Sequence, residues 1–194
     1  MQIESIDFFE TWAPVVQWIA VRSMMILATQ LNLVSAQANI TAAVVHAPLG
    51  PDEHIYVRQP VGFQRDGDLV LKLKRSVYGL CQSSHNFFHY LSDHLVDQSL
   101  TPSVYDPCLF IGKSVIVVVY IDDLLIYAKS DAMITTLISS LKTAGMCIHQ
   151  EGTAECFLGV DIIRSFDPTS SQITLLQTSL WPMQQPFHPH QHSG

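Results

Sequence analysis

Apolar residues recur at helical spacing in three stretches of this chain, and each stretch predicts an amphipathic helix. The first covers residues 15–31, the second begins at Ser83 or Ser84 and runs to about Leu100, and the third follows Ser130. Serine is a favoured helix cap, and Gly145 is a suitable end for the third helix. The apolar stripes are Val15, Trp18, Ile19, Met25 and Ile26; Phe87, Phe88, Leu91 and Leu95; and Ile134, Leu137, Ile138 and Leu141.

Short β-type runs lie between these helices and predict strands. They cover residues 33–40, the region around 55–57, residues 69–73 and residues 157–162. Because strands and helices alternate irregularly and at least one hairpin is expected, the pattern favours an α+β fold. We expect a mainly antiparallel sheet with the helices packed on one face.

The stretch from Ser114 to Ala128 holds only two charged residues, Asp122 and Asp123, between two apolar runs. This pattern predicts a β-hairpin with both carboxylates at its tip. A tight two-residue turn favours Asn-Gly or Asp-Gly, so an Asp-Asp pair needs another explanation. A divalent cation would relieve the repulsion between the carboxylates, and a solvated turn without a metal is the alternative.

The composition narrows the class of protein. The 194 residues carry a formal net charge of −7, and 14% of them are charged while 48% are hydrophobic. This balance excludes a disordered acidic chain and argues against an independent nucleic-acid binder, because phosphate contacts need Lys and Arg. No stretch predicts a transmembrane helix or a signal peptide, and the four cysteines form no close pair. We therefore expect an intracellular protein without membrane contact.

Six motifs in order along the chain carry a resemblance to a known family. Tyr120-Ile121-Asp122-Asp123 resembles the Tyr-Val-Asp-Asp hairpin of reverse transcriptases. Residues 10–16, Glu-Thr-Trp-Ala-Pro-Val-Val, are similar to the Glu-Thr-Phe-Ala-Pro-Val-Val signature of copia-type retrotransposon polyproteins. Further landmarks of that family match residues 56–63, 76–82, 106–110 and 157–160. The chain is identified on these motifs as a copia-type reverse transcriptase domain.

The resemblance implies a right-hand polymerase palm, which adds a deoxynucleotide to a primer 3′ end on an RNA or DNA template. Asp122 and Asp123 fall on two of the three catalytic carboxylates, which hold Mg²⁺ or Mn²⁺ in the family. Gln82, Val44 and Tyr120 fall on substrate-binding positions. The implied partners are template-primer, deoxynucleoside triphosphate, and the rest of a polyprotein or a dimer partner. The implied location is the cytoplasm, a virus-like particle or the nucleus.

This chain departs from the family at several of these positions. Asn39 stands where the third, metal-bridging Asp is expected. Its neutral amide offers one oxygen, so we expect weak metal binding and a rate loss of about 10²–10³-fold or more. Val44 replaces an aromatic residue that excludes a 2′-hydroxyl, which predicts poor discrimination between ribo- and deoxynucleotides. Cys81 and His85 replace a Lys and an Arg, which removes positive charge near the expected phosphates.

The resemblance also predicts how the chain is organised. Residues 1–166 are assigned to a partial palm-like domain, 167–180 to a remnant of the following segment, and 181–194 to a disordered tail. Fingers and thumb are expected to be largely missing. The favoured hypothesis is a partial reverse transcriptase domain that is inactive in this chain. The alternatives are a non-catalytic remnant that binds nucleic acid or protein, a working enzyme within a larger assembly, and a different two-metal enzyme such as a nuclease.

Overall fold

The structure is a computed structural model. It describes residue 2 and residues 8–64, 69–157, 160–167 and 170–176, with backbone only at 164–167 and 170–172. The predicted tail at residues 181–194 lies outside the described residues, as do residues 177–180 of the predicted remnant. Within the described part, no helix is long and apolar enough to cross a membrane.

The three predicted helices are confirmed to within a few residues. They are α1 (Trp18–Gln30), α2 (Ser83–Asp97) and α3 (Asp131–Thr143), and the short 3₁₀ turn η1 (Ala43–His46) follows the first strand. The strands in the described part are β1 (Val34–Ile40), β2 (Tyr56–Arg58), β3 (Val70–Lys72), β4 (Thr101–Pro102), β5 (Leu109–Ile111), β6 (Val115–Tyr120), β7 (Asp123–Ala128), β8 (Ile148–Gly152), β9 (Cys156–Phe157), β10 (Val160–Asp167) and β11 (Ser170–Leu176).

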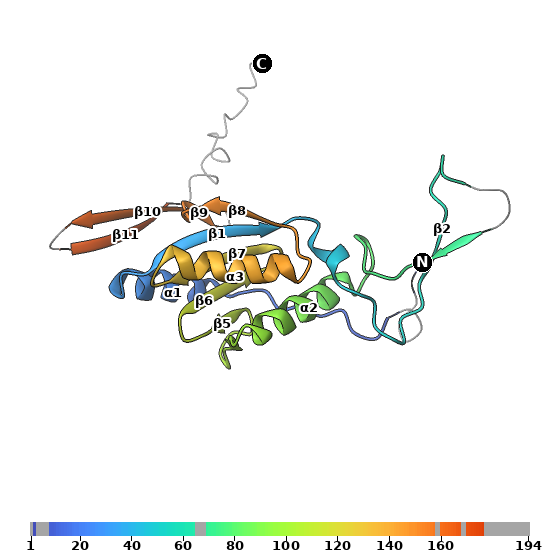
Figure 1. The fold of residues 1–194 in the computed structure, drawn as a ribbon, viewed down its shortest axis with the longest axis horizontal. Helices are drawn as coiled ribbons and strands as arrows, with labels where there is room; N and C mark the ends of the chain where they lie inside the picture. The colour runs from blue at the N-terminus through green and yellow to red at the C-terminus, as the bar shows by residue number, and fades with distance from the viewer. Residues whose placement is uncertain (1, 3–7, 65–68, 158–159, 168–169, 177–194) are drawn as a thin grey trace, which may run out of the picture.

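The main sheet has six strands in the order β4-β5-β6-β7-β1-β8, and each neighbouring pair in it is antiparallel. The predicted hairpin forms its centre as β6 and β7, with β1 hydrogen-bonded beside β7. Two small sheets, β11-β10-β9 and β2-β3, extend from this body toward opposite ends of the molecule (Figure 1). The predicted α+β class with a mainly antiparallel sheet is confirmed.

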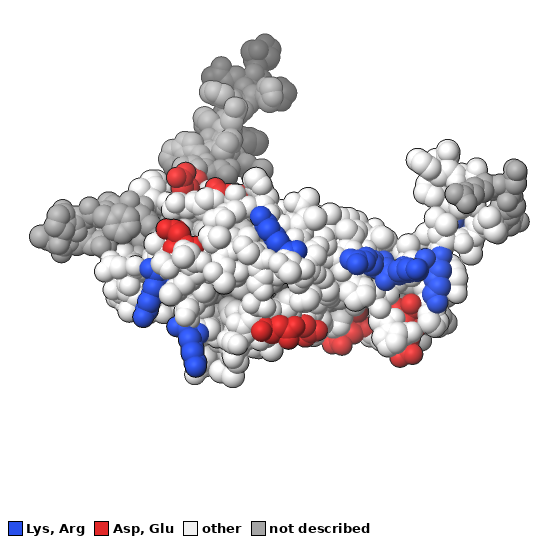
Figure 2. All heavy atoms as spheres, in the orientation of Figure 1, with Lys and Arg blue, Asp and Glu red and all other residues white. Residues whose placement is uncertain are grey.

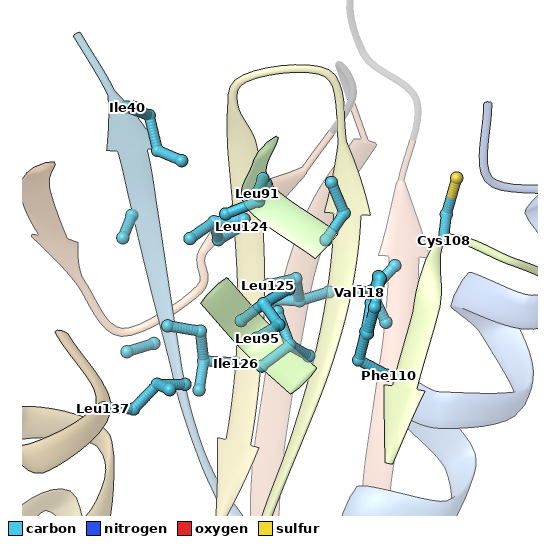
Figure 3. Packing of buried hydrophobic residues seen from close by; sticks show 14 of the residues in the cluster. Ile40, Leu91, Leu95, Cys108, Phe110, Val118, Leu124, Leu125, Ile126 and Leu137 are labelled. Atoms are coloured by element: carbon cyan, nitrogen blue, oxygen red, sulfur yellow. The ribbon is translucent and has the colours of Figure 1, made fainter. Parts of the chain in front are cut away.

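The central strands are buried on both faces. Successive residues Leu124, Leu125 and Ile126 of β7 are each 0% exposed, although neighbouring side chains on a strand point to opposite faces. Leu91 and Leu95 of α2 lie over this part of the sheet (Figure 3). Helices packed on one face, as predicted, therefore cannot account for all of this burial, because both faces of the central strands are covered.

Helix α1 and the β10–β11 hairpin complete the covering of the sheet. Residues Ile19, Ala20 and Met24 of α1 line a hollow with Leu109 and Ile111, which share one face of β5. Ile162, Ile173 and Leu175 of β10 and β11 join the same hydrophobic core. The apolar runs of β6 and β7 do not alternate with polar residues, and such unbroken runs are typical of strands that are buried on both faces.

Two local expectations also need correction. Residues 157–162 were predicted as one strand, but β9 ends at Phe157, and Val160 of β10 pairs back with Phe157 in antiparallel register. Ser83 is the first residue of α2, and Gln82 takes the cap position. The Ser83 hydroxyl donates instead to the carbonyl of Val77 at 2.6 Å, so it fastens the preceding loop to the helix.

Cys108 provides a prediction about thiol chemistry. Burial, with a smaller contribution from the charge of Asp106, raises the pKa of the Cys108 thiol to about 12. An unfolded thiol has a pKa of about 8.5, so this group favours folding fully below that pH and less as the pH rises toward 12. At pH 8 we expect a maleimide to label the exposed Cys81, Cys147 and Cys156 quickly and Cys108 only on unfolding. Fast labelling of Cys108 in the native chain, measured by peptide mass spectrometry, would contradict this.

Candidate functional site

The hairpin between β6 and β7 carries the two predicted carboxylates, but its turn lies one residue earlier than expected. Tyr120 pairs with Asp123, so the two turn residues are Ile121 and Asp122, and Asp123 opens β7. Ile121 has a φ of 55°, a left-handed conformation that is rare for a β-branched residue. Strand β1 stabilises the turn in this register, because the backbone N–H of Ile40 donates to the carbonyl of Asp122 at 2.8 Å.

Strand β1 places Asn39, which stands where the family's third Asp is expected, next to the hairpin. Asn39 lies directly opposite Asp123 in the antiparallel pairing of β1 with β7. The Asn39 Nδ2 donates a hydrogen bond to the Asp123 Oδ1 at 3.0 Å. Both side chains are half-buried, as is Asp122. The structure therefore places side by side two residues that are 84 positions apart in the sequence.

This hydrogen bond changes the electrostatics of the site. An aspartate at position 39 would set a second negative charge against Asp123, and a cation would be needed between them. The amide instead supplies a donor to the carboxylate and turns its single oxygen away from it. The Asp123 carboxylate thus has a hydrogen-bond partner from the protein itself.

The donor set at this site does not fit the divalent ions that reverse transcriptases use. Hard ions such as Mg²⁺ take several oxygen ligands, with charge supplied by carboxylates. Here two carboxylates from adjacent residues remain, and the third group presents an N–H. Among the residues that the structure describes, no group of three His, Cys, Asp or Glu side chains is arranged to hold a metal ion.

The three predicted substrate-binding residues lie in different environments. Tyr120 is half-buried and stands opposite Asp123, so it belongs to the hairpin site. Val44, in η1, is 5% exposed and is part of the hydrophobic core. Gln82 is 1% exposed, and its side-chain oxygen accepts a hydrogen bond from Gln2 at 3.0 Å. In this structure neither Val44 nor Gln82 presents an exposed side chain to a substrate.

His149 is a neighbour of the site that sequence reasoning missed. It lies on β8 directly opposite Asn39, so Asp123, Asn39 and His149 form a row across three strands. The His149 side chain is exposed. Residues 148–152 were not predicted as a strand, because Ile-His-Gln-Glu-Gly contains a single apolar residue and no alternating pattern. Only the pairing with β1 reveals the position.

The fold and the hairpin can be compared with the class of protein that the sequence motifs suggest. An antiparallel sheet that carries adjacent carboxylates at a central hairpin, beside a third polar side chain from the next strand, is the arrangement expected from the polymerase resemblance. A family model described as reverse transcriptase (RNA-dependent DNA polymerase) matches residues 1–179. The chain belongs to this family.

Its relatives are Pol polyproteins of copia-type transposons. The Pol polyprotein of transposon TNT 1-94 from Nicotiana tabacum is 31% identical over 183 residues, which are 91% of this chain and 13% of that polyprotein. That of transposon RE1 from Arabidopsis thaliana is 27% identical over 169 residues, 84% of this chain and 11% of the relative. The Ty1-NL2 Gag-Pol polyprotein of Saccharomyces cerevisiae is 27% identical over 124 residues, 63% and 7% respectively. The chain thus spans no more than 13% of the length of these relatives.

Proposed function

We propose that this chain is a polymerase palm of a copia-type reverse transcriptase that no longer supports polymerisation. The ancestral reaction is two-metal transfer of a deoxynucleotide from its triphosphate to a primer on an RNA or DNA template. Asp122, Asp123 and Asn39 occupy the positions of its catalytic carboxylates. The family membership and the pairing of β1 with the carboxylate hairpin support this assignment.

The observation that carries the loss of activity is the hydrogen bond from Asn39 to Asp123. Asn39 offers an N–H donor where a charged oxygen ligand is expected. Its hydrogen bond also engages Asp123, one of the two remaining carboxylates. Loss of a single group that stabilises transition-state charge costs about 10²–10³-fold in rate. Here the same substitution also weakens binding of the ions, so the two effects reinforce each other.

A primer-extension assay tests this proposal. We expect the 194-residue chain to show no extension of a labelled primer on an RNA or a DNA template with Mg²⁺ or Mn²⁺. A reverse transcriptase of known activity, assayed in parallel on the same template-primer, is the positive control. Extension by the unmodified chain that disappears in Asp123→Asn would overturn the proposal.

A second candidate function is nucleic-acid binding without catalysis, and the distribution of positive charge favours it. Five of the ten Lys and Arg residues lie between positions 58 and 75. Arg58, Lys72, Lys74 and Arg75 are exposed on or next to the β2–β3 hairpin. Figure 2 shows Lys and Arg side chains gathered toward the β2 end of the molecule. This concentration offsets locally the acidic balance of the whole chain.

The same labelled template-primer tests binding by fluorescence anisotropy. Contacts between Lys or Arg and phosphates release counterions, so binding through the hairpin should weaken steeply with salt. The variant Lys72→Gln with Lys74→Gln should weaken binding and flatten the salt dependence, whereas Lys142→Gln on α3 should leave both unchanged. Equal effects of the two variants would rule out a specific role for this hairpin.

A further inference from the structure

Two histidines lie next to each other on the surface of α2. His85 and His89 are four positions apart, a spacing that places two side chains on the same face of a helix. Their ring centroids are 4.4 Å apart, and the ring planes are inclined by 58°. Two imidazoles bound to one tetrahedral ion, with Zn–N bonds of about 2.0–2.1 Å, have centroids roughly 5 Å apart. The rings therefore need only a small movement to reach a common ion, and the exposed His89 side chain has room for it.

A contact with the backbone orients the ring of His85. Its Nδ1 lies 2.7 Å from the carbonyl oxygen of Trp12, in the segment before α1. A carbonyl oxygen only accepts hydrogen bonds, so Nδ1 carries the proton and the lone pair of the neutral ring lies on Nε2. Histidines that bind metal ions in proteins usually donate their other ring N–H to a backbone carbonyl or a carboxylate, which fixes the tautomer. His85 is thus already oriented as metal-binding histidines are.

Glu10 supplies negative charge beside the second ring nitrogen of His85. The Glu10 Oε2 lies 3.8 Å from the His85 Nε2, which is too far for a hydrogen bond. The His85 side chain is 16% exposed and that of Glu10 is 68% exposed, so the carboxylate is free to adjust while the ring is held. A carboxylate at this distance attracts a cation toward Nε2.

We propose that His85 and His89 bind a divalent ion of a late transition metal, such as Ni²⁺ or Zn²⁺, through one nitrogen each. Imidazole suits these ions, whereas Mg²⁺ takes oxygen ligands. Within the described residues no third His, Cys, Asp or Glu is arranged with the pair to enclose an ion, so water supplies the remaining ligands. The alternative is a purely structural role, in which His85 fastens Trp12 to α2. The site uses neither Asp122 nor Asp123 and does not depend on polymerase activity.

Chemical modification of individual histidines tests the proposal in the intact chain. Diethyl pyrocarbonate acylates unprotonated imidazole nitrogens, and tandem mass spectrometry locates each modified residue. Saturating Ni²⁺ should slow the modification of both His85 and His89 about fivefold or more, because most sites are then filled. His54 and His149, which are exposed elsewhere, should keep their rates. Failure of Ni²⁺ to slow the modification of both members of the pair would overturn the proposal.

A readout for each residue is needed because other parts of the chain attract the same ions. His188, His190 and His192 lie outside the described residues and also offer imidazoles, so total Ni²⁺ uptake does not identify a site. A chain of net charge −7 also attracts any divalent cation, and Mg²⁺ at the same concentration is the control for this effect. We expect Mg²⁺ to leave the modification rates unchanged. Equal protection by Mg²⁺ and Ni²⁺ would show charge attraction alone and would overturn the proposal.

Single substitutions test whether the two rings act together. In His85→Gln the Ni²⁺ concentration that half-protects His89 should rise about tenfold or more, since loss even of a group that supports a ligand typically costs about 10–100-fold in metal affinity. The reciprocal variant His89→Gln, which changes an exposed side chain, should do the same for His85. Glu10→Gln should raise the half-protecting concentration about two- to fivefold, in the range of an exposed charge pair.

The matched control for these variants is His94→Gln on the same helix, whose ring contacts Tyr90 instead of the pair. It removes one imidazole from α2, and the half-protecting Ni²⁺ concentration should change less than twofold. His85→Gln and His89→Gln variants that both behave like His94→Gln would show that the two rings do not share an ion and would overturn the proposal.

Discussion

Replacing Asn39 by Asp should lower the stability of the metal-free chain and make its stability depend on Mn²⁺. The substitution removes the hydrogen bond to Asp123, and a hydrogen bond to a charged group contributes about 1.5–3 kcal/mol. It also sets two carboxylates against each other across the β1–β7 pair. We expect a loss of about 2–3 kcal/mol, which is a fall of roughly 5–10 °C in melting temperature for a chain of this size.

Mn²⁺ should restore the stability that Asn39→Asp loses and should leave the stability of the unmodified chain unchanged. A ligand present at 100 times its Kd stabilises the folded state by about 2.7 kcal/mol. The control is Gln37→Glu, which adds a charge on the same face of β1 two residues earlier, opposite Leu125. It should show no Mn²⁺ dependence. Thermal denaturation followed by circular dichroism gives the melting temperature of all three proteins. An Asn39→Asp chain whose melting temperature does not change with Mn²⁺ would contradict this description of the site.

Replacing Asp106 by Asn should destabilise the fold strongly, although Asp106 lies outside the candidate site. Its carboxylate is 3% exposed and accepts backbone N–H groups from Gln17 and Cys108, each at 2.9 Å. It thereby fixes the start of α1, where Gln17 is the cap residue without a side-chain cap of its own, to the loop before β5. An amide cannot accept both bonds, because one of its two positions is an NH₂ donor.

The expected cost of Asp106→Asn is about 2–4 kcal/mol, since a buried N–H loses its acceptor and a charge-assisted bond becomes neutral. The exposed Asp93→Asn on α2 should change stability by no more than about 0.5 kcal/mol. Urea denaturation compares the two. A second readout is the thiol of Cys108, whose pKa should fall in Asp106→Asn because a nearby negative charge is removed. A cost for Asp106→Asn as small as that for Asp93→Asn would contradict the anchoring role.

Helical periodicity and the two apolar runs of the hairpin were sufficient to predict the three helices and the central pair of strands. The order of strands in the sheet could not be predicted, because it depends on contacts between distant segments. The register of the turn was predicted wrongly for the same reason. Pairing Asn39 with Asp123 moves the turn onto Ile121, which local turn preferences would avoid.

The candidate site was predicted in part. Motif resemblance identified Asp122, Asp123 and Asn39, and the structure brings Asn39 and Asp123 into contact. The direction of that contact, with the amide donating to the carboxylate, cannot be inferred from residue identities alone. The burial of Gln82 and Val44 was also beyond the sequence, because it depends on how the loop before α2 and the turn after β1 pack.

The most direct test of the central claim is whether the hairpin of the unmodified chain binds Mn²⁺. The paramagnetic ion broadens the amide signals of nearby residues in an NMR spectrum. Because Asn39 already donates a hydrogen bond to the Asp123 carboxylate, we predict no saturable broadening around residues 120–124 at Mn²⁺ concentrations up to about 1 mM. A Kd of about 1 mM corresponds to a binding free energy of about −4 kcal/mol. Saturable broadening well below that concentration, centred on Asp123 and lost in Asp123→Asn, would show that the site still holds a metal ion and would contradict this claim.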